Sequence, residues 1–472
     1  MLDKPHVILL PLLILAATAT ATTAAPTASA VTLAIDTARP AQTILGFGAS
    51  GCWWAQDIGA WPEAKRREIM RLLYDKQTGL GMTIYRHNLG ADTKRDTGMG
   101  YPNRRVESML DTKTGRYDWS RDANSRRILR DAVDAGASEV ILFVNSPPVS
   151  MTKNGRGYGD KIDGKNTSNL APARYADFAA CLGEITEHFL RVDKLPVTVL
   201  SPLNEPEWDW SKPRQEGCFN TPAETAAILK ATLDEIRRRA LPVRVEGPEG
   251  GSWKSTIPYF EAILAIPELR AGMTDFAVHS YWSDNTQREK FSAWAAKNLP
   301  DARIHMTEWC EMKQGAASGM DSALVMARTI IDDFTISRAA TWQYWVALNA
   351  ADFHAGLIYY KNNTREYTIT KRYWVYGQFT RYLEKGSIVL PLKSSDKQTP
   401  AMAARLPDGR VAVVCANLSN SNKNLDIKFP AEETWRQQKR IITDDTRDNA
   451  ATPAGAALPP RSVITIIFQK AP

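Results

Sequence analysis

The sequence predicts an α/β protein: a (β/α)8 TIM barrel with a C-terminal antiparallel β-sandwich side domain that includes an N-terminal strand. Eight short apolar segments, each ending in polar residues or glycine, alternate with amphipathic segments of helical spacing. No glycine-rich GxGxxG turn follows the first of these segments, which argues against a dinucleotide-binding fold. After about Ser387 the pattern changes to short alternating strands without a convincing helix.

The eight apolar segments are predicted to be barrel strands, because near-continuous apolar strands that alternate with helices form parallel sheets covered on both faces. They span residues 44–50, 82–88, 139–145, 197–204, 243–247, 275–280, 303–307 and 340–346. Predicted helices between them include residues 62–74, 173–190, 222–239 and 321–334. Eight such units favour a closed barrel, whose active site lies at the carboxyl ends of its strands.

The C-terminal part reads as a small antiparallel β-domain. Alternating strands at 410–417, 425–429 and 462–468 are separated by turn signals. The segment 31–36 has strand character and precedes the first barrel strand, so we expect it to pair with this domain. The predicted division of the chain is a signal peptide at 1–30, an N-terminal strand segment at 31–43, the barrel at 44–386 and the β-sandwich at 387–472.

Residues 1–30 have the pattern of a secretory signal peptide. An apolar run at 7–17 is followed by a Thr/Ala stretch that ends in an Ala-Ser-Ala cleavage site at 28–30. The run is shorter than the roughly 20 apolar residues of a membrane-spanning helix, and we expect no transmembrane segment elsewhere. Asp3 and Pro11 weaken the pattern, so a retained anchor is the alternative. The prediction is a secreted or periplasmic monomer, with surface attachment left open.

The composition is that of an ordinary globular protein. With 472 residues, 44% hydrophobic and 24% charged, disorder, collagen, a coiled coil and a polytopic membrane protein are disfavoured. The formal charge of +7 is spread along the chain, and no nucleic-acid motif accompanies it.

The chain has five cysteines, an odd number, and their spacing does not suggest metal ligands. We expect most of them to be buried thiols, with Cys52 and Cys310 reduced at the barrel rim. Neither a metal nor a cofactor is expected.

Two predicted strands end in a carboxylate, which is the pattern that glycoside hydrolysis requires. The fourth strand ends at Asn204-Glu205-Pro206 and the seventh at Thr307-Glu308-Trp309. One carboxyl group must be protonated to assist the leaving group while the other is ionised to attack the anomeric carbon. Repulsion between two close carboxylates separates their pKa values in this sense. The alternative is that both are rim acids or salt-bridge partners.

The chain resembles glycoside hydrolase family 30, in its endo-β-1,6-galactanase-like branch, across nearly the whole mature sequence. The motifs that carry the resemblance are Gly46-Phe47-Gly48-Ala49-Ser50-Gly51 with Trp53-Trp54, Tyr85-Arg86-His87-Asn88, Asn145-Ser146-Pro147-Pro148 with Met151-Thr152, Ser201-Pro202-Leu203-Asn204-Glu205-Pro206, and Thr307-Glu308-Trp309. The resemblance implies a retaining barrel glycosidase whose β-domain packs beside the barrel and takes in the N-terminal strand.

The same resemblance implies roles for individual residues. Glu205 would be the general acid/base and Glu308 the nucleophile. Asn204 would bind the sugar 2-hydroxyl, and Arg86 would keep the nucleophile ionised. Tyr281 would steady the nucleophile, with His279 as the second candidate for that position; a buried structural role for His279 is an equal alternative.

Other acids near the strand ends compete with this pair for the catalytic roles. Glu207 and Asp209 follow the acid in a loop, Glu311 lies beyond the seventh strand, and Glu249 after the fifth strand reaches the same rim, where it could bind sugar hydroxyls.

Tryptophans gather at the predicted strand ends, where their rings could stack on the C–H faces of sugars. Seven of the 14 fall there: Trp53, Trp54, Trp208, Trp210, Trp282, Trp309 and Trp345. We expect substrate contacts from Trp53, Trp54, Trp208, Trp309 and Trp345 in particular, although some of the seven would only pack loops onto the barrel. The basic loop 151–170 is expected to be a solvated border of the cleft, or else to contact an acidic decoration of the polymer.

These observations predict a secreted retaining glycoside hydrolase whose partner is an oligo- or polysaccharide. A β-1,6-galactan is the preferred substrate on resemblance alone. The alternatives are another family 30 activity, such as a β-xylanase, β-glucosidase or β-fucosidase, and a carbohydrate-binding barrel without catalysis. The presence of both Glu205 and Glu308 argues against the last alternative.

Overall fold

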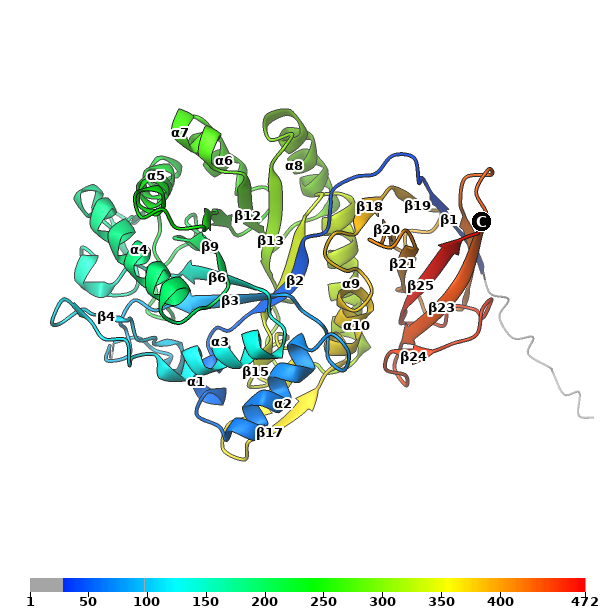
Figure 1. Cartoon of the computed structure of the whole chain (residues 1–472), viewed down its shortest axis with the longest axis horizontal. Coiled ribbons are helices and arrows are strands. Elements are labelled where there is room, and N and C mark those ends of the chain that lie inside the picture. The colour runs from blue at the N-terminus through cyan, green and yellow to red at the C-terminus, as the bar shows by residue number, and fades with distance from the viewer. Residues whose placement is uncertain (1–28, 97, 472) are drawn as a thin grey trace, which may run out of the picture.

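The computed structural model describes residues 29–96 and 98–471, which form a barrel with a smaller β-domain beside it (Figure 1). Apart from its last two residues, the predicted signal peptide lies outside the described residues. Those two, Ser29 and Ala30, are the first residues of strand β1 (Ser29–Ile35), so the N-terminal strand starts two residues earlier than expected. Among the described helices, none combines the length and apolar character needed to cross a membrane.

Eight parallel barrel strands form at the predicted places. They are β2 (Gly46–Ser50), β3 (Ile84–Leu89), β6 (Glu139–Val144), β9 (Val197–Ser201), β10 with β11 (Arg244–Val245 and Pro248–Gly250), β12 (Asp275–His279), β13 (Arg303–Trp309) and β14 (Thr341–Val346). The fifth strand has two halves: β10 pairs with β9, and β11 pairs with β12. Backbone hydrogen bonds from Glu246 N to Leu200 O (3.1 Å) and from Ala277 N to Gly247 O (2.9 Å) complete the ring. The predicted (β/α)8 barrel is confirmed.

Helices cover the outside of the barrel. They are α1 (Trp54–Ile58), α2 (Glu63–Tyr74), α3 (Ala123–Ala135), α4 (Tyr175–Arg191), α5 (Pro222–Arg238), α6 (Ile257–Leu264), α7 (Pro267–Gly272), α8 (Asn285–Asn298), α9 (Met320–Thr335) and α10 (Lys371–Thr380). The start of α5 is fixed by a capping box, in which the Thr221 hydroxyl accepts from Glu224 N and the Glu224 carboxylate accepts from Thr221 N. Asp284 and Gln287 cap α8 in the same way.

Short strands also form within the loops of the barrel. They are β4 (Leu110–Asp111) with β5 (Arg116–Tyr117), β7 (Asp160–Ile162) with β8 (Lys165–Thr167), and β15 (Leu348–Asn349) with β16 (Ile358–Lys361) and β17 (Glu366–Ile369).

The β-domain consists of two sheets. One contains β18 (Ile388–Leu390), β20 (Ala401–Arg405), β21 (Val411–Asn417), β25 (Ser462–Lys470), β23 (Trp435–Thr443) and β24 (Ala450–Ala451); the other contains β19 (Leu392–Ser394), β1 and β22 (Lys423–Lys428). The predicted recruitment of an N-terminal strand is confirmed. The prediction of a purely antiparallel sandwich is corrected in one pair, since β1 runs parallel to β22. No hairpin joins these two strands, so chain connection does not impose the antiparallel direction.

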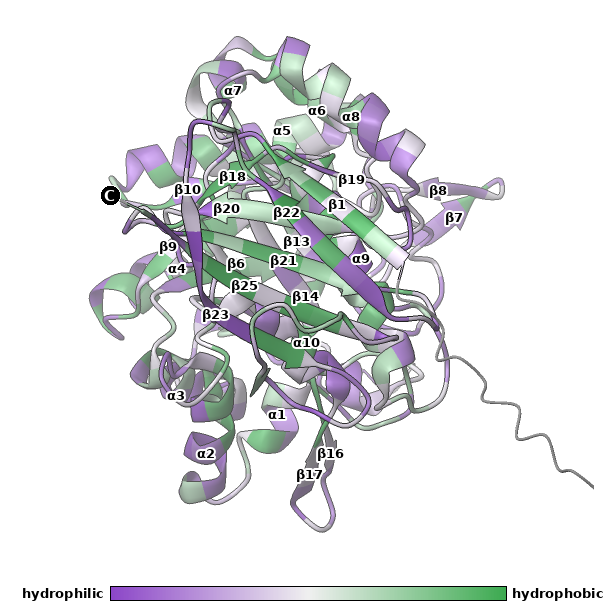
Figure 2. Cartoon of the chain, turned by 90° about the vertical axis from the view of Figure 1, so that its right-hand side faces the viewer, coloured by the Kyte–Doolittle hydropathy of each residue, from purple (hydrophilic) through white to green (hydrophobic). Residues whose placement is uncertain are grey.

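The central strands of the six-stranded sheet, β20, β21 and most of β25, are buried on both faces, which attaches the β-domain to the barrel. Val413 and Cys415 of β21 pack with Val31 and Leu33 in the core between the two sheets. The alternate residue Val414 belongs to the core that continues into the barrel. The β-domain lies in front of the barrel in Figure 2. Its placement therefore depends on apolar packing rather than on a linker.

We expect Ile467→Ala in β25 to lower the free energy of unfolding by about 2–5 kcal/mol, because it leaves a cavity in a packed core. Ile467 is 3% exposed on the face toward the barrel, whereas Ile162 in the β7–β8 hairpin is 64% exposed. Urea denaturation followed by circular dichroism measures the change, with Ile162→Ala as the matched control. Equal stability of the two variants would contradict the attachment described above.

Candidate active site

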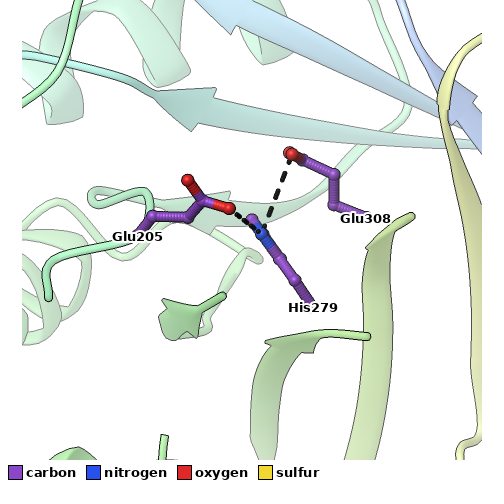
Figure 3. Close-up of side chains that lie close together, drawn as sticks. All are labelled: Glu205, His279 and Glu308. Carbon is purple, nitrogen blue, oxygen red and sulfur yellow. Dashed lines mark hydrogen bonds and ion pairs between the residues drawn. The ribbon is translucent and has the colours of Figure 1, made fainter. Parts of the chain in front are cut away.

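The two carboxylates predicted at the strand ends come together at the mouth of the barrel. Glu308 lies in β13, one residue before its end, and Glu205 lies in the turn that follows β9. Figure 3 shows both side chains pointing toward His279 of β12. Ligating atoms of these three residues lie within 4.8 Å of one another. The two carboxyl groups are therefore close enough to act on the same sugar.

Glu308 is held by two donors. Arg86 Nη1 donates to its Oε2 at 2.6 Å, and the Tyr281 hydroxyl donates to its Oε1 at 3.0 Å. The pKa of Glu308 lies above its usual value, because burial outweighs the opposing positive charges of His279 and Arg86. The Arg86 guanidinium also stacks over the Phe143 ring at 3.7 Å, which fixes its plane. A carboxylate in this setting is oriented and paired with a permanent cation.

His279 joins two carboxylates. Its Nδ1 lies 3.1 Å from Glu205 Oε1 and its Nε2 lies 3.1 Å from Glu249 Oε2, and Nδ1 is also 3.7 Å from Glu308 Oε1. Burial alone would lower the pKa of His279, but the carboxylates of Glu308, Glu205 and Glu249 outweigh it and raise the pKa to about 10. The imidazole is therefore protonated near neutral pH and donates to acids on both sides.

Glu249 lies below the cleft, where sugar hydroxyls do not reach it. Its side chain is fully buried and accepts hydrogen bonds from Ser201 Oγ (2.8 Å) and from Thr307 Oγ1. Arg86 Nη2 is 3.5 Å from its Oε2. Although burial raises the pKa of Glu249, the charges of Arg86 and His279 lower it to about 2. The possibility that Glu249 binds sugar hydroxyls at the rim does not fit this burial, and its carboxylate instead supplies a negative charge to Arg86 and His279.

Asn204 is positioned by the same arginine. Its Oδ1 accepts from Arg86 Nη2 at 3.2 Å, so the amide nitrogen is the group left to face a ligand. Trp210 supports the preceding turn, since its Nε1 donates to the backbone oxygen of Glu205 at 2.9 Å.

Glu207 and Glu311 have other partners. The Glu207 carboxylate accepts from Gly251 N at 2.6 Å, and Glu311 pairs with Lys313 at 2.6 Å and with His354 at 2.9 Å. Neither takes part in the Glu205–Glu308 arrangement.

The three central side chains also have the composition of a metal site, but their protonation opposes that use. Glu205, His279 and Glu308 form such a group. A histidine must be neutral to ligate a metal, whereas both ring nitrogens of His279 face carboxylates and its pKa is about 10. The arrangement is suited to moving and holding protons.

Two tryptophan pairs flank the mouth. Trp208 and Trp282 stack in parallel, with ring centroids 5.1 Å apart, and are 44% and 56% exposed. Trp53 and Trp345 meet edge to face at 5.4 Å and are half-buried. Exposed indole faces beside the two acids are suited to the apolar faces of sugar rings.

Trp54 and Trp309 are both largely buried. Trp54 is 2% exposed within α1, and its Nε1 donates to Ser50 O at 2.9 Å. This burial leaves no face of Trp54 for a sugar, so the expectation of stacking on it is corrected. Trp309 is 6% exposed and packs against Trp342 and Tyr344, but it also lines a concave surface beside α9, so a substrate contact there stays a prediction.

The loop 151–170 folds into the β7–β8 hairpin, and its cations are partly committed. Lys153 Nζ donates to Ser168 O at 2.8 Å, and Lys161 pairs with Asp209 at 2.7 Å.

All five cysteines are buried and free. Burial raises the pKa of Cys52 and of Cys310, so both remain neutral thiols.

The comparisons with known proteins point to one glycosidase family. The sequence model of O-glycosyl hydrolase family 30 matches residues 30–261. An endo-β-1,6-galactanase of Hypocrea rufa is 24% identical over 454 residues, which cover 91% of this chain and 86% of that protein. The resemblance to this family is confirmed.

Solved structures share the fold. A conserved exported protein from Bacteroides fragilis superposes with a TM-score of 0.81 at 22% identity, over 92% of this chain and 100% of that one. The catalytic domain of the family 30 xylanase C from Talaromyces cellulolyticus gives a TM-score of 0.73 at 16% identity, over 93% and 100%.

We expect His279 to remain protonated up to about pH 10, whereas an unperturbed histidine titrates near pH 6.5. Because folding raises this pKa, the proton stabilises the folded state: the contribution is complete below about pH 6.5 and is lost as the pH rises through 10. Glu249→Gln removes the negative charge of the carboxylate that faces His279 Nε2. The pKa of His279 should therefore fall.

NMR of ¹³C-labelled histidine rings measures this titration, with the His279 signal assigned by its absence in His279→Gln. Glu261→Gln, which alters a carboxylate outside the site that accepts from Trp294, is the control. A wild-type His279 that titrates near pH 6.5, or a titration unchanged in Glu249→Gln, would contradict the charge arrangement.

Proposed function

We propose that the chain is a glycoside hydrolase of family 30 that cleaves β-linked glycans with retention of anomeric configuration, as an endo-β-1,6-galactanase. The observation that carries the mechanism is the approach of Glu205 and Glu308 at the barrel mouth, within 4.8 Å through their nearest ligating oxygens. Retaining glycosidases hold their two carboxyl groups about 5–5.5 Å apart, whereas inverting enzymes leave about 6.5–9.5 Å for a water molecule.

Glu308 is the nucleophile in this proposal. Its carboxylate oxygen attacks the anomeric carbon as the bond from that carbon to the leaving oxygen breaks, which gives a glycosyl ester. Arg86 at 2.6 Å and Tyr281 at 3.0 Å keep the attacking group ionised and aimed. They also stabilise the same carboxylate when it is released in the second step.

Glu205 is the general acid and then the general base. It gives its proton to the departing glycosidic oxygen, and later takes one from the water that cleaves the ester. His279 donates to Glu205 Oε1 at 3.1 Å, so the acidic proton is carried by Oε2. The Asn204 amide, held through Arg86 at 3.2 Å, binds the 2-hydroxyl of the sugar at the cleavage point.

The substrate assignment rests on the galactanase relative, which aligns over 91% of this chain. The pairs Trp208–Trp282 and Trp53–Trp345 would stack on sugars on either side of the cleavage point. A β-xylanase is the second candidate, supported by the structural similarity to the Talaromyces xylanase. The predicted signal peptide at 1–30 supports export, with the polysaccharide outside the cell as substrate.

Replacing either of the two acids should greatly slow hydrolysis while the protein stays folded. We expect Glu308→Gln to reduce kcat to background, and Glu205→Gln to reduce it by about 10²–10⁴-fold, the usual contribution of a general acid. Activity on β-1,6-galactan measures both. Glu384→Gln, which alters an exposed carboxylate paired with Lys76, is the matched control. Full activity in either catalytic variant would refute the assignment.

Proton NMR of the first-formed product should show the β-anomer, because two displacements at the anomeric carbon restore its configuration. The same spectra recorded on β-1,6-galactan, xylan and β-1,6-glucan would identify the substrate. An initial α-anomer from a β-linked substrate would rule out Glu308 as nucleophile. Hydrolysis of xylan but not of galactan would select the second candidate.

A further inference from the structure

A second concave surface lies beside the barrel mouth, between helices α8 and α9 and the β-domain. We call it the lateral groove. Its volume of about 820 Å³ lies within the range of roughly 300–1,000 Å³ typical of ligand sites. The residues used in the argument are Trp282, Asn285, Leu324, Val325, Leu418 and Arg461. In Figure 1, α9 lies on the side of the barrel that faces the β-domain.

Trp282 connects the groove to the cleft. Its indole is 56% exposed, lines the groove and stacks on Trp208, which follows Glu205 by three residues. Its backbone has φ +47°, a left-handed conformation that a bulky residue adopts only when the surroundings impose it. The residue before it, Tyr281, donates to Glu308. A glycan that leaves the two acids over Trp208 therefore meets Trp282 next.

Part of the groove lining is apolar. Leu324 and Val325 come from α9, and Leu418 comes from the β-domain. Val325 is 42% exposed, which is unusual for a valine on a helix that packs between two domains. An exposed indole that continues into an aliphatic surface is suited to the C–H faces of successive sugar rings.

The charged residues that line the groove are balanced in number. Three aspartates (Asp284, Asp321 and Asp332) and three arginines (Arg288, Arg328 and Arg461) line the groove. Arg328 pairs with Asp332 at 2.7 Å, and Arg461 pairs with Asp321 across the junction of the barrel and the β-domain. Paired groups still offer hydrogen bonds to hydroxyls, while their charges cancel. The groove is therefore suited to a neutral polyhydroxylated ligand rather than to an acidic one.

We propose that the lateral groove binds an arm of the neutral β-linked glycan that extends beyond the cleft past Trp282. This inference rests on the proposed glycosidase function and extends it. The β-domain then takes part in substrate binding through Leu418 and Arg461. Substrates long enough to reach the groove gain contacts that short ones do not make.

The test compares a long and a short substrate. Val325→Arg places a long charged side chain in the groove, at a position outside the catalytic residues. Val192→Arg makes the same change at an exposed valine (64%) after α4, away from both the cleft and the groove. The values of kcat/KM are measured on polymeric β-1,6-galactan and on β-1,6-galactotetraose, with xylan and xylotetraose used instead if xylan is the glycan hydrolysed.

We expect Val325→Arg to reduce kcat/KM on the polymer by about fivefold or more, the scale of one lost ring contact, and to leave the tetraose value within about twofold. Val192→Arg should change neither value. Equal effects of Val325→Arg on both substrates, or no effect on the polymer, would overturn the groove assignment. A wild-type enzyme inactive on every glycan would overturn the proposed function itself, so the two failures are distinguishable.

Discussion

The barrel mouth depends on balancing charges that are removed from water. Glu205, His279, Glu249, Arg86 and Glu308 form a chain in which acids and bases alternate, with separations of 3.1, 3.1, 3.5 and 2.6 Å between successive partners. A single buried ion is costly, and removal of one partner from a buried pair commonly destabilises a protein by about 3–5 kcal/mol. The five groups are therefore required together. A parallel barrel meets this requirement because it brings the carboxyl ends of separate strands to one place.

The same requirement explains the irregular backbone at the site. Glu205 and Glu249 both have positive φ, at 42° and 62°, which is uncommon for residues other than glycine. The backbone N–H of Glu205 donates to the carbonyl of Glu249 at 2.9 Å. The fifth strand is interrupted between β10 and β11 just before Glu249. Regular extended strands would alternate side chains strictly, and this local departure is what turns Glu249 beneath the acids. Such departures persist where the surroundings over-determine them.

The sequence predicts the two carboxylates proposed as catalytic better than it predicts the groups that support them. Apolar periodicity places Glu205 and Glu308 at strand ends, where any barrel presents its side chains. The orientation of a residue beyond a strand end depends on the turn and on its tertiary neighbours, which periodicity does not encode. Trp54 is turned inward by its hydrogen bond to Ser50, and Glu249 by the interruption of its strand. Composition could not have identified either outcome.

The division of the chain at residue 387 marks a change in sequence pattern, but packing and hydrogen bonds continue across it. The β-domain packs on α9, and the same helix carries the buried Asp333, whose Oδ1 accepts from Ser280 Oγ and from Arg288 Nε, both at 2.8 Å. Ser280 lies between His279 and Tyr281, which contact Glu205 and Glu308. The β-domain thus supports the helix that fixes this three-residue segment. Its attachment contributes to the geometry of the acids as well as to the stability of the barrel.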